Sequence, residues 1–264
     1  MKDVNQKNLN RENILSYLNI DKKIKVNVEI FNQIDSTNSY LLNKKQVINE
    51  LNICIAEMQT KGKGRSGKVW ESPKKKNIYL SIGTLLNKEI SELDGFSILI
   101  ALMICNALED LYKIKAKIKW PNDLYLKNKK FGGILIETKI VNKKLSIVIG
   151  IGLNIFMKTN EFINQEWTSL HIEKPFLEID RNILISKIIS EISNNLNYFL
   201  KKGFKAFKKD FDKRNILKNK KVLVSNFSSD CIALDVNEDG SLNLLVDNLI
   251  QKVTSGEVSL KIQK

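Results

Sequence analysis

The sequence predicts an α+β fold, made of a large first unit and a small β unit at its C-terminal end. Strand-like apolar runs recur along the first 155 residues, and long helices are expected at 91–111 and 181–200. After Lys220 the pattern changes to short strands at close spacing. With 264 residues, of which 43% are apolar, the chain can form one sizeable domain with a small appendage. We therefore predict domains at 1–215 and 216–264.

The first unit is expected to begin with two short helices among six strands. The helix at 9–19 would place Ile14 and Leu18 on one apolar face. The helix at 35–43 opens with the polar run DSTN, which suits a helix N-cap. The strands are predicted from apolar runs bounded by polar or glycine-rich stretches. They are Val26–Ile34, Ile53–Glu57, Asn77–Leu86, Lys115–Trp120, Phe131–Ile140 and Leu145–Ile155.

Two longer helices complete this unit. The stretch 91–111 is apolar nearly all round at its centre, so it is predicted to be buried. The section 156–178 has no clear period and is predicted to be irregular. The stretch 181–200 has an apolar stripe at helical spacing, and a further helix is expected at about 203–213.

The last 45 residues or so are expected to form a small antiparallel β-barrel. So short a segment has little core of its own, and we expect it to pack against the first unit. The predicted strands are Val222–Ser225, Cys231–Val236, Ser241–Val246 and Val258–Ile262.

The charge is strongly positive, with 43 basic and 29 acidic residues giving a net charge of +14. Such a balance is compatible with nucleic-acid binding. However, 39 of the basic residues are lysines, only four are arginines, and they are spread along the whole chain. We interpret most of this charge as a solvated surface and expect no specific nucleic-acid partner.

The remaining composition indicates a cytoplasmic protein. The longest apolar run is Ile98–Cys105, which is too short to span a membrane, and the N-terminus has no apolar signal region. Three distant cysteines in apolar runs are expected to be buried thiols. His171 is the single histidine, which argues against a His-rich metal site or a mechanism that needs two imidazoles.

The segment 59–70, QTKGKGRSGKVW, is the most informative in the chain. Its glycines alternate with cations, so backbone N–H groups could wrap an anion while the cations neutralise it. The G-x-G-x-x-G pattern of dinucleotide-binding proteins needs a strand before it and a helix after it. Here a polar loop precedes Trp70 and a strand, so that interpretation fails. A basic surface turn is the alternative.

Four motifs, in order, resemble those of biotin–protein ligases. Residues 62–70, GKGRSGKVW, are similar to the family's G-R-G-R-x-G-R-x-W loop, and residues 35–38, DSTN, are similar to its D-S-T-N motif. Residues 119–124, KWPNDL, followed by 130–137, KFGGILIE, resemble its K-W-P-N-D and K-x-x-G-I-L-x-E segments. Residues 150–154, GIGLN, resemble its G-I-G-x-N strand end. The resemblance extends from about residue 10 to the C-terminus.

This resemblance implies a fold and a reaction. The fold is a mixed, largely antiparallel sheet with helices packed on one face, followed by a small SH3-like β-barrel. Biotin and MgATP would give biotinyl-5′-AMP and pyrophosphate, and a lysine of a biotin carboxyl carrier domain, as in acetyl-CoA carboxylase, would then displace AMP. ATP and Mg²⁺ enter as a substrate complex. Homodimers formed by pairing sheet edges are possible, and no membrane partner is implied.

The resemblance also assigns site residues, with Arg65 and Lys130 in catalytic roles. Asp123 would contact Mg²⁺, since this ion prefers oxygen ligands. The residues implied for the nucleotide are Gly62, Asn122, Asn154 and Trp167. Those implied for biotin are Ser36, Thr37, Asn38, Gln59, Lys63, Gly64, Arg65 and Lys130.

The sequence departs from the family pattern at two positions and leaves two alternative functions open. Lys63 and Lys68 stand where the pattern has arginine, so bidentate recognition is lost there. A lipoyl or octanoyl transferase or ligase of the same fold is one alternative. A biotin-responsive DNA-binding repressor is the other, but only 34 residues precede Asp35, and a winged helix needs about 60. We therefore expect the form without an N-terminal DNA-binding domain.

Overall fold

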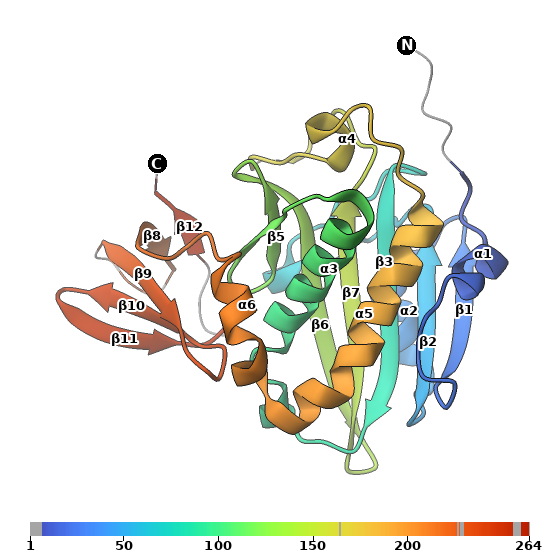
Figure 1. Ribbon diagram of the computed structural model, residues 1–264, viewed down its shortest axis with the longest axis horizontal. Coiled ribbons are helices and arrows are strands. Elements are labelled where there is room, and N and C mark those ends of the chain that lie inside the picture. The colour runs from blue at the N-terminus through green and yellow to red at the C-terminus, as the bar shows by residue number, and fades with distance from the viewer. Residues whose placement is uncertain (1–6, 164, 226, 228–229, 256–259, 264) are drawn as a thin grey trace.

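The computed structural model describes residues 7–163, 165–225, 227, 230–255 and 260–263. Its main feature is a seven-stranded sheet in the order β1-β2-β3-β7-β6-β5-β4 (Figure 1). The pair β1–β2 is parallel and the other five pairs are antiparallel, which confirms the predicted mixed, largely antiparallel sheet. The strands are β1 (Lys25–Phe31), β2 (Glu50–Ala56), β3 (Asn77–Leu86), β4 (Lys117–Lys119), β5 (Asp123–Leu126), β6 (Lys129–Val141) and β7 (Lys144–Asn154).

The long helices α3 (Phe96–Tyr112) and α5 (Arg181–Lys202) lie side by side on one face of this sheet (Figure 1). The short helix α1 (Arg11–Ser16) packs on α5. The prediction of helices on one face holds for these three. Helix α2 (Thr37–Asn43) differs, because it lies against the opposite face over β2, β3 and β7.

Strand β7 shows how the two faces are used. Ile147, Ile149 and Ile151 belong to the same core cluster as α3 and α5. The alternate residue Val148 packs instead with Leu41 of α2. Since successive side chains of a strand point to opposite faces, Gly150 also lies on the α2 face. This second face carries the site described below.

Helix α3 is preceded by a short 3₁₀ helix, η2 (Ile90–Leu93). Gly95, with φ of 75°, separates the two, so the helix predicted at 91–111 is broken near its start. The stretch Ile90–Tyr112 has the length and composition of a membrane span, but more than half of it is buried inside the fold. This stretch contains the buried core helix that the sequence predicts at 91–111. The other short helices are η1 (Arg65–Gly67), α4 (Leu170–Glu173), η3 (Phe204–Phe207) and α6 (Lys208–Asp212).

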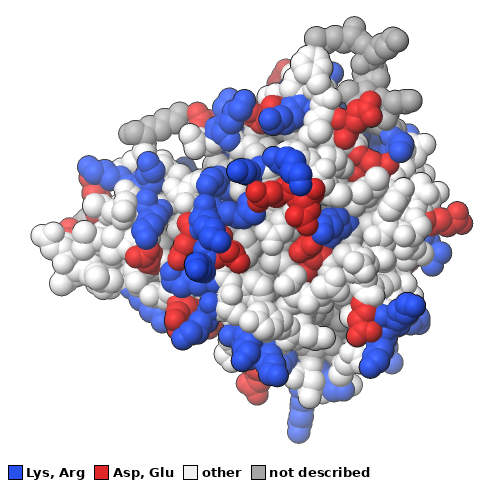
Figure 2. All heavy atoms as spheres, viewed as in Figure 1, with Lys and Arg blue, Asp and Glu red and all other residues white. Residues whose placement is uncertain are grey.

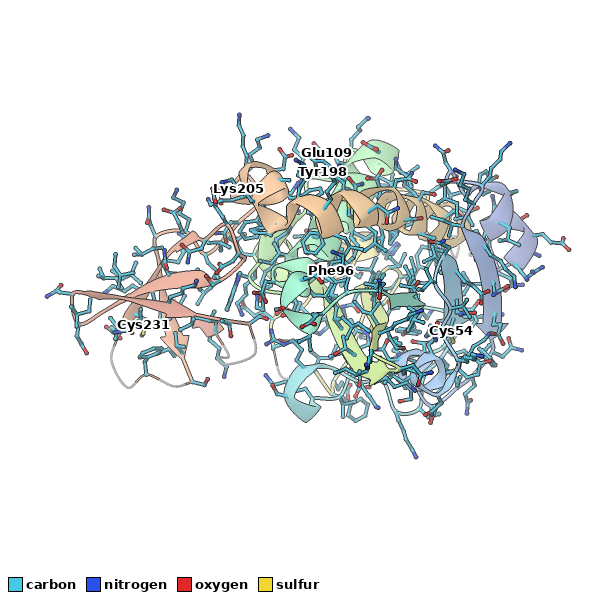
Figure 3. All side chains as sticks on the ribbon, turned by 90° about the horizontal axis from the view of Figure 1, so that it is seen from below. Cys54, Phe96, Glu109, Tyr198, Lys205 and Cys231 are labelled. Atoms are coloured by element: carbon cyan, nitrogen blue, oxygen red, sulfur yellow. The ribbon has the colours of Figure 1, made fainter. Side chains whose placement is uncertain are left out.

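The small C-terminal unit is a five-stranded antiparallel sheet in the order β11-β10-β9-β8-β12. It packs against the large unit, where the Trp120 Nε1–H donates to the Gly240 carbonyl at 2.8 Å. Figure 3 shows Cys231 in this sheet, far from Cys54 in the large one. The start of the strand predicted at 258–262 lies outside the described residues. The strands are β8 (Lys220–Val224), β9 (Cys231–Val236), β10 (Leu242–Val246), β11 (Leu249–Val253) and β12 (Leu260–Ile262).

The segment that joins the two units is itself paired with the large sheet. Ile118 of β4 accepts a hydrogen bond from Ile216 N at 3.0 Å and donates one to the Arg214 carbonyl at 2.9 Å. The domain boundary predicted after residue 215 falls in this segment. Across the face in Figure 2, lysines and arginines are spread widely with acidic residues among them.

Candidate active site

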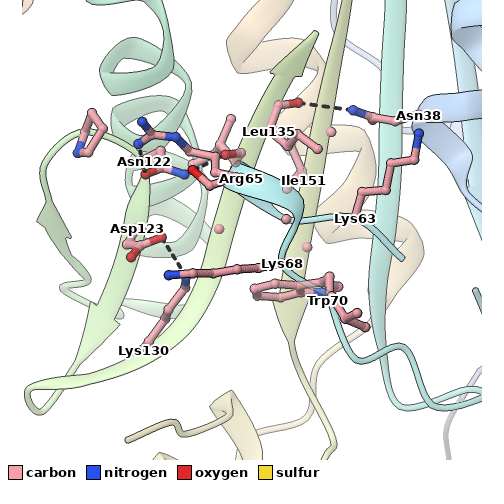
Figure 4. A pocket seen from close by; sticks show the side chains of 18 of the residues that line it. Asn38, Lys63, Arg65, Lys68, Trp70, Asn122, Asp123, Lys130, Leu135 and Ile151 are labelled. Carbon is pink, nitrogen blue, oxygen red and sulfur yellow. Dashed lines mark hydrogen bonds and ion pairs between the residues drawn. The ribbon is translucent and has the colours of Figure 1, made fainter. Parts of the chain in front are cut away.

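A cavity of about 220 Å³ opens on the α2 face of the large sheet. Its walls come from α2, from the glycine-rich loop at 58–76, and from strands β3 to β7 (Figure 4). Leu260 and Lys261 of the small sheet also line it. Ten of the residues predicted from the sequence line it. They are Ser36, Thr37, Asn38, Gln59, Lys63, Gly64, Arg65, Asn122, Asp123 and Lys130.

One end of the cavity is polar and largely uncharged. Ser36 is the N-cap of α2, so Thr37 and Asn38 stand at the first turn of that helix. Gln59 Oε1 accepts from both the backbone N–H (2.9 Å) and the hydroxyl (3.1 Å) of Thr37. The Gln59 amide in turn donates to Ser72 Oγ at 3.0 Å. The side chains are therefore oriented before any ligand binds, which lowers the entropic cost of binding.

Asn38 is held more firmly still. Its Nδ2 donates to Glu137 Oε2 at 2.8 Å and to the Leu135 carbonyl at 3.3 Å, and its Oδ1 lies 2.6 Å from the hydroxyl of Ser81. Ser81 was not predicted as a site residue. It lies inside an apolar run of β3, and the register of the sheet places it opposite Gly150 on the cavity face.

Gly150 and Gly152 explain the GIG motif of β7. A Cβ atom at Gly150 would lie 2.3 Å from Asn38 Oδ1, and one at Gly152 would lie 2.4 Å from Trp70 Cε2. Both glycines are thus required because side chains of the cavity lie directly on the strand. The indole N–H of Trp70 is buried and has no hydrogen-bond partner among the described residues. A donor of this kind is available to a ligand acceptor.

Arg65 reaches across the cavity from the glycine-rich loop (Figure 4). Its Nη1 donates to Asn122 Oδ1 at 3.0 Å, and its Nη2 donates to the carbonyl of Ser255. Burial lowers the pKa of Arg65 from its ordinary value, against the attraction of Asp123. The guanidinium therefore joins three parts of the wall: the loop, the start of β5 and the small unit.

Asn122 lines the cavity and is held at both ends of its amide. Its Nδ2 donates to the Ile134 carbonyl at 2.8 Å, while its Oδ1 holds Arg65. Both ends of the amide are used within the protein. Asn122 thus positions Arg65, and the nucleotide contact that the resemblance implies for it stays a prediction.

Lys130 and Asp123 form an ion pair in the cavity, with 2.7 Å between Nζ and Oδ1. The Lys130 ammonium also lies 5.6 Å from the centre of the Trp70 ring. Lys119, which was not predicted as a site residue, donates to the Leu260 carbonyl at 2.6 Å, and burial lowers its pKa. Its signal in the sequence was its place at the start of the KWPND motif.

The remaining three predicted residues do not line the cavity. Gly62 is packed under the loop, where a Cβ atom would lie 2.3 Å from the Trp70 carbonyl. Asn154 is buried and donates to the Thr168 carbonyl at 3.1 Å. Trp167 forms a backbone bridge to Lys130, and Gln165 of the same segment reaches the rim. Gly62 and Asn154 thus make structural contacts, and the nucleotide contacts implied for them stay predictions.

The charges within the cavity are strongly unequal. Asp123 is the one acidic residue among those that line it, against six cations: Lys63, Arg65, Lys68, Lys119, Lys130 and Lys261. Among the described residues, no three His, Cys, Asp or Glu side chains come together as a metal site. A Mg²⁺ ion at Asp123 would therefore need further oxygen ligands, which nucleotide phosphates supply. The cavity suits a ligand with a polar, uncharged end and a strongly anionic end.

Comparison with known proteins is consistent with this geometry. The model of the biotin/lipoate A/B protein ligase family matches residues 30–154. A bifunctional ligase/repressor, BirA, of Escherichia coli is 34% identical over 239 residues, covering 89% of this chain and 74% of its own. A biotin–[acetyl-CoA-carboxylase] ligase of Mycobacterium tuberculosis is 25% identical, covering 88% of each chain.

A solved structure of the biotin protein ligase from Aquifex aeolicus in complex with biotin and ATP superposes with a TM-score of 0.78. It is 30% identical in sequence, and the match covers 90% of this chain and 99% of that one. The similarity therefore includes both the large sheet and the small C-terminal unit.

Proposed function

The chain belongs to the biotin/lipoate A/B protein ligase family, and on that basis we propose that it is an ATP-dependent biotin–protein ligase. In the first half-reaction, a biotin carboxylate oxygen attacks the α-phosphorus of ATP, and pyrophosphate leaves. In the second, the ε-amine of a carrier lysine attacks the acyl carbon of biotinyl-5′-AMP. AMP leaves and an amide bond remains. The named relatives and the ligands of the Aquifex complex support this assignment.

The polar end of the cavity fits the biotin ring system. Biotin carries an uncharged ureido group, which offers one carbonyl acceptor and two N–H donors. Thr37, Asn38 and Gln59 present fixed hydroxyl and amide groups of the matching kind. A site built from hydrogen-bonding groups rejects ligands that leave those groups unpaired. This property favours biotin over the dithiolane ring of lipoate, which has no such donors or acceptors.

The cationic end fits the chemistry of activation. The biotin carboxylate and the triphosphate repel each other, so cations must lie between them for the carboxylate to attack. Lys130 of β6 and Arg65 of the glycine-rich loop both line this part of the cavity (Figure 4). Fixed positive charges aimed at developing negative charge are among the largest contributions to catalysis. No nucleophile of the enzyme is needed, because the reaction depends on positioning and electrostatics.

The acceptor in the second half-reaction is proposed to be a lysine on a biotin carrier domain of a carboxylase, as the name of the mycobacterial relative suggests. It attacks as the neutral amine, and the proton lost when the amide forms goes to water. Asp123 is the acidic group in the lining of the cavity, and its Oδ1 is shared with Lys130. We assign Asp123 to holding the positions of Lys130 and of the phosphate-bound Mg²⁺.

The observation on which the proposal depends is the combination, in one cavity, of a prearranged amide and hydroxyl network with an excess of five positive charges. The test is an assay of pyrophosphate release from MgATP with biotin, lipoate or octanoate as the acid. Transfer to a carrier domain is then followed by mass spectrometry. We expect turnover with biotin and none with lipoate or octanoate. Turnover with lipoate or octanoate, and none with biotin, would overturn the proposal.

A further inference from the structure

The glycine-rich loop of the cavity begins and ends at one buried ion pair outside the cavity. Glu57 directly follows β2, and Arg181 is the first residue of α5. The guanidinium binds the carboxylate with two bonds, Nη1 to Oε2 at 2.7 Å and Nη2 to Oε1 at 3.1 Å. The two side chains are 1% and 5% exposed, and neither lines the cavity.

The same guanidinium also fixes the other end of the loop. Arg181 Nη1 donates to the carbonyl of Asn77, the first residue of β3, at 3.1 Å. The backbone N–H of Lys75 donates to the Glu57 carbonyl at 2.9 Å. The segment from 58 to 76 therefore leaves β2 and returns to β3 at a single point. Gln59, Arg65 and Trp70 are all carried by that segment.

Water has little access to this point. The N-terminal segment covers it, since Leu9 N lies 3.4 Å from Glu57 Oε1 and Arg181 Nη2 lies 3.5 Å from the Lys7 carbonyl. In such surroundings the planar guanidinium group, with its several N–H donors, is well suited to bind a carboxylate and a backbone carbonyl together, and an ammonium group is not. This is one of only four arginines in a chain with 39 lysines.

We propose that Arg181 is a positioning residue for the glycine-rich loop. By holding both ends together, it limits how far the loop opens, and so it sets how tightly the loop covers the anionic end of the cavity. The effect on nucleotide retention rests on the proposed function. The effect on loop opening does not, and it can be measured without any ligand.

The informative variant is Arg181→Lys. Lysine keeps the positive charge beside Glu57, so no buried carboxylate is left unpaired. However, one ammonium group cannot replace both the two bonds to Glu57 and the bond to the Asn77 carbonyl. The Arg181 Nε–H has no partner among the described residues, so nothing is lost at that atom. The matched control is Arg214→Lys, because Arg214 also joins a carboxylate, Glu109, to a backbone carbonyl, that of Ala116.

The measurement is hydrogen exchange of the full chain without ligand. The reporters are the amides of Gly64 and Trp70, which close the loop by bonding the carbonyls of Lys68 and Gly62. In Arg181→Lys we expect them to exchange about tenfold faster, as for the loss of one charge-assisted hydrogen bond, while the amides of α3 are unchanged. Arg214→Lys should leave both reporters at the wild-type rate.

Nucleotide binding gives a second readout. If the proposed function is correct, Arg181→Lys should raise KM for ATP about tenfold and change kcat little, because the catalytic groups themselves are intact. Wild-type exchange rates at Gly64 and Trp70 in a folded Arg181→Lys protein would overturn the proposal, as would equal acceleration in Arg214→Lys. If the wild-type protein has no ligase activity but Gly64 and Trp70 still exchange faster in Arg181→Lys, the proposed function is disproved and the positioning role of Arg181 stays in place.

Discussion

Lys130 of β6 and Asp123 of β5 form an ion pair between neighbouring strands, with their charged atoms 2.7 Å apart and their side chains only 16% and 18% exposed, although the register pairs Lys130 with Tyr125 and Asp123 with Gly133. The two residues are seven positions apart, and the hairpin that joins β5 to β6 brings them together. An ion pair so far removed from water strengthens as the local dielectric constant falls. It keeps the Lys130 ammonium inside the cavity, where it also lies against the Trp70 ring.

Replacement of Lys130 by methionine should therefore abolish a charge at the reacting centre and also leave Asp123 without its partner. We expect kcat for pyrophosphate release to fall by about 10²–10³-fold. The matched control is Lys129→Met, which removes an exposed lysine one position earlier on the same strand. A rate within twofold of wild type in Lys130→Met would remove this residue from the catalytic group.

Arg65→Ala should release the adenylate intermediate early. The guanidinium is held by Asn122 and Ser255 and is ready to bind an anion with its remaining donors. The loss of one charge-assisted hydrogen bond costs about 1.5–3 kcal/mol, or roughly 10- to 100-fold in the dissociation rate. Release can be followed by filter binding of the labelled adenylate.

The control for this prediction is Lys61→Ala. Lys61 is an exposed cation on the same loop that does not line the cavity, so the change in net charge is the same. Equal dissociation rates in the two variants would show that only the overall charge of the loop matters, and the specific role of Arg65 would be rejected.

Gly152→Ala should damage the cavity through the position of Trp70. The added Cβ would lie 2.4 Å from the indole, so the ring must move off the strand. We expect a loss of about 1–3 kcal/mol in the free energy of unfolding, as for other overpacked sites, and at least a tenfold loss of biotin affinity by calorimetry.

Gly133→Ala provides the milder comparison, because its Cβ would lie 3.3 Å from the same ring. A small shift of the indole accommodates that contact. If biotin affinity falls as much in Gly133→Ala as in Gly152→Ala, the close approach of Trp70 to β7 is not what shapes the site.

The parts of the fold that the sequence predicted well are those with strong local patterns. The bounds predicted for β3, Asn77–Leu86, match the structure, and the helix predicted at 181–200 is α5. Ser36 is the N-cap that the DSTN motif indicated. Strand β11 was missed because four of its five residues are exposed, so it has no apolar alternation to detect. Strand β5, with four residues and none of them β-branched, was also missed.

The site was predicted where a residue's role is local to its motif, and missed where the role depends on distant pairing. Ser81 has no signal within its apolar run. It reaches Asn38 only because β3 pairs with β7 in a register that places Ser81 opposite Gly150. Arg181 and Glu57 are separated by 124 positions, and no spacing rule connects them. Asn122 was assigned from its motif, which gave no sign of its hydrogen bond to Arg65.

Lys119 should give the protein an unusual pH dependence. Burial lowers its pKa below the ordinary 10.5, so the folded state loses this proton before the unfolded state does as the pH rises. At this group the unfolded chain then binds more protons, so the contribution of Lys119 to the free energy of unfolding increases with pH between the lowered pKa and 10.5. The affinity for ATP should fall over the same interval, because a neutral amine no longer attracts phosphate.

The contributions of Lys119 to stability and to nucleotide affinity are therefore expected to change in opposite directions in this alkaline range, and each is read as the difference between wild type and Lys119→Arg. Lys119→Arg should remove both contributions, since arginine stays charged throughout. Lys61→Arg, at an exposed position, should retain them. Urea unfolding and calorimetric ATP titrations, repeated along a pH series that ends at 10.5, measure the two quantities. If wild type and Lys119→Arg give superimposable profiles, the buried ammonium of Lys119 is not coupled to the anion site.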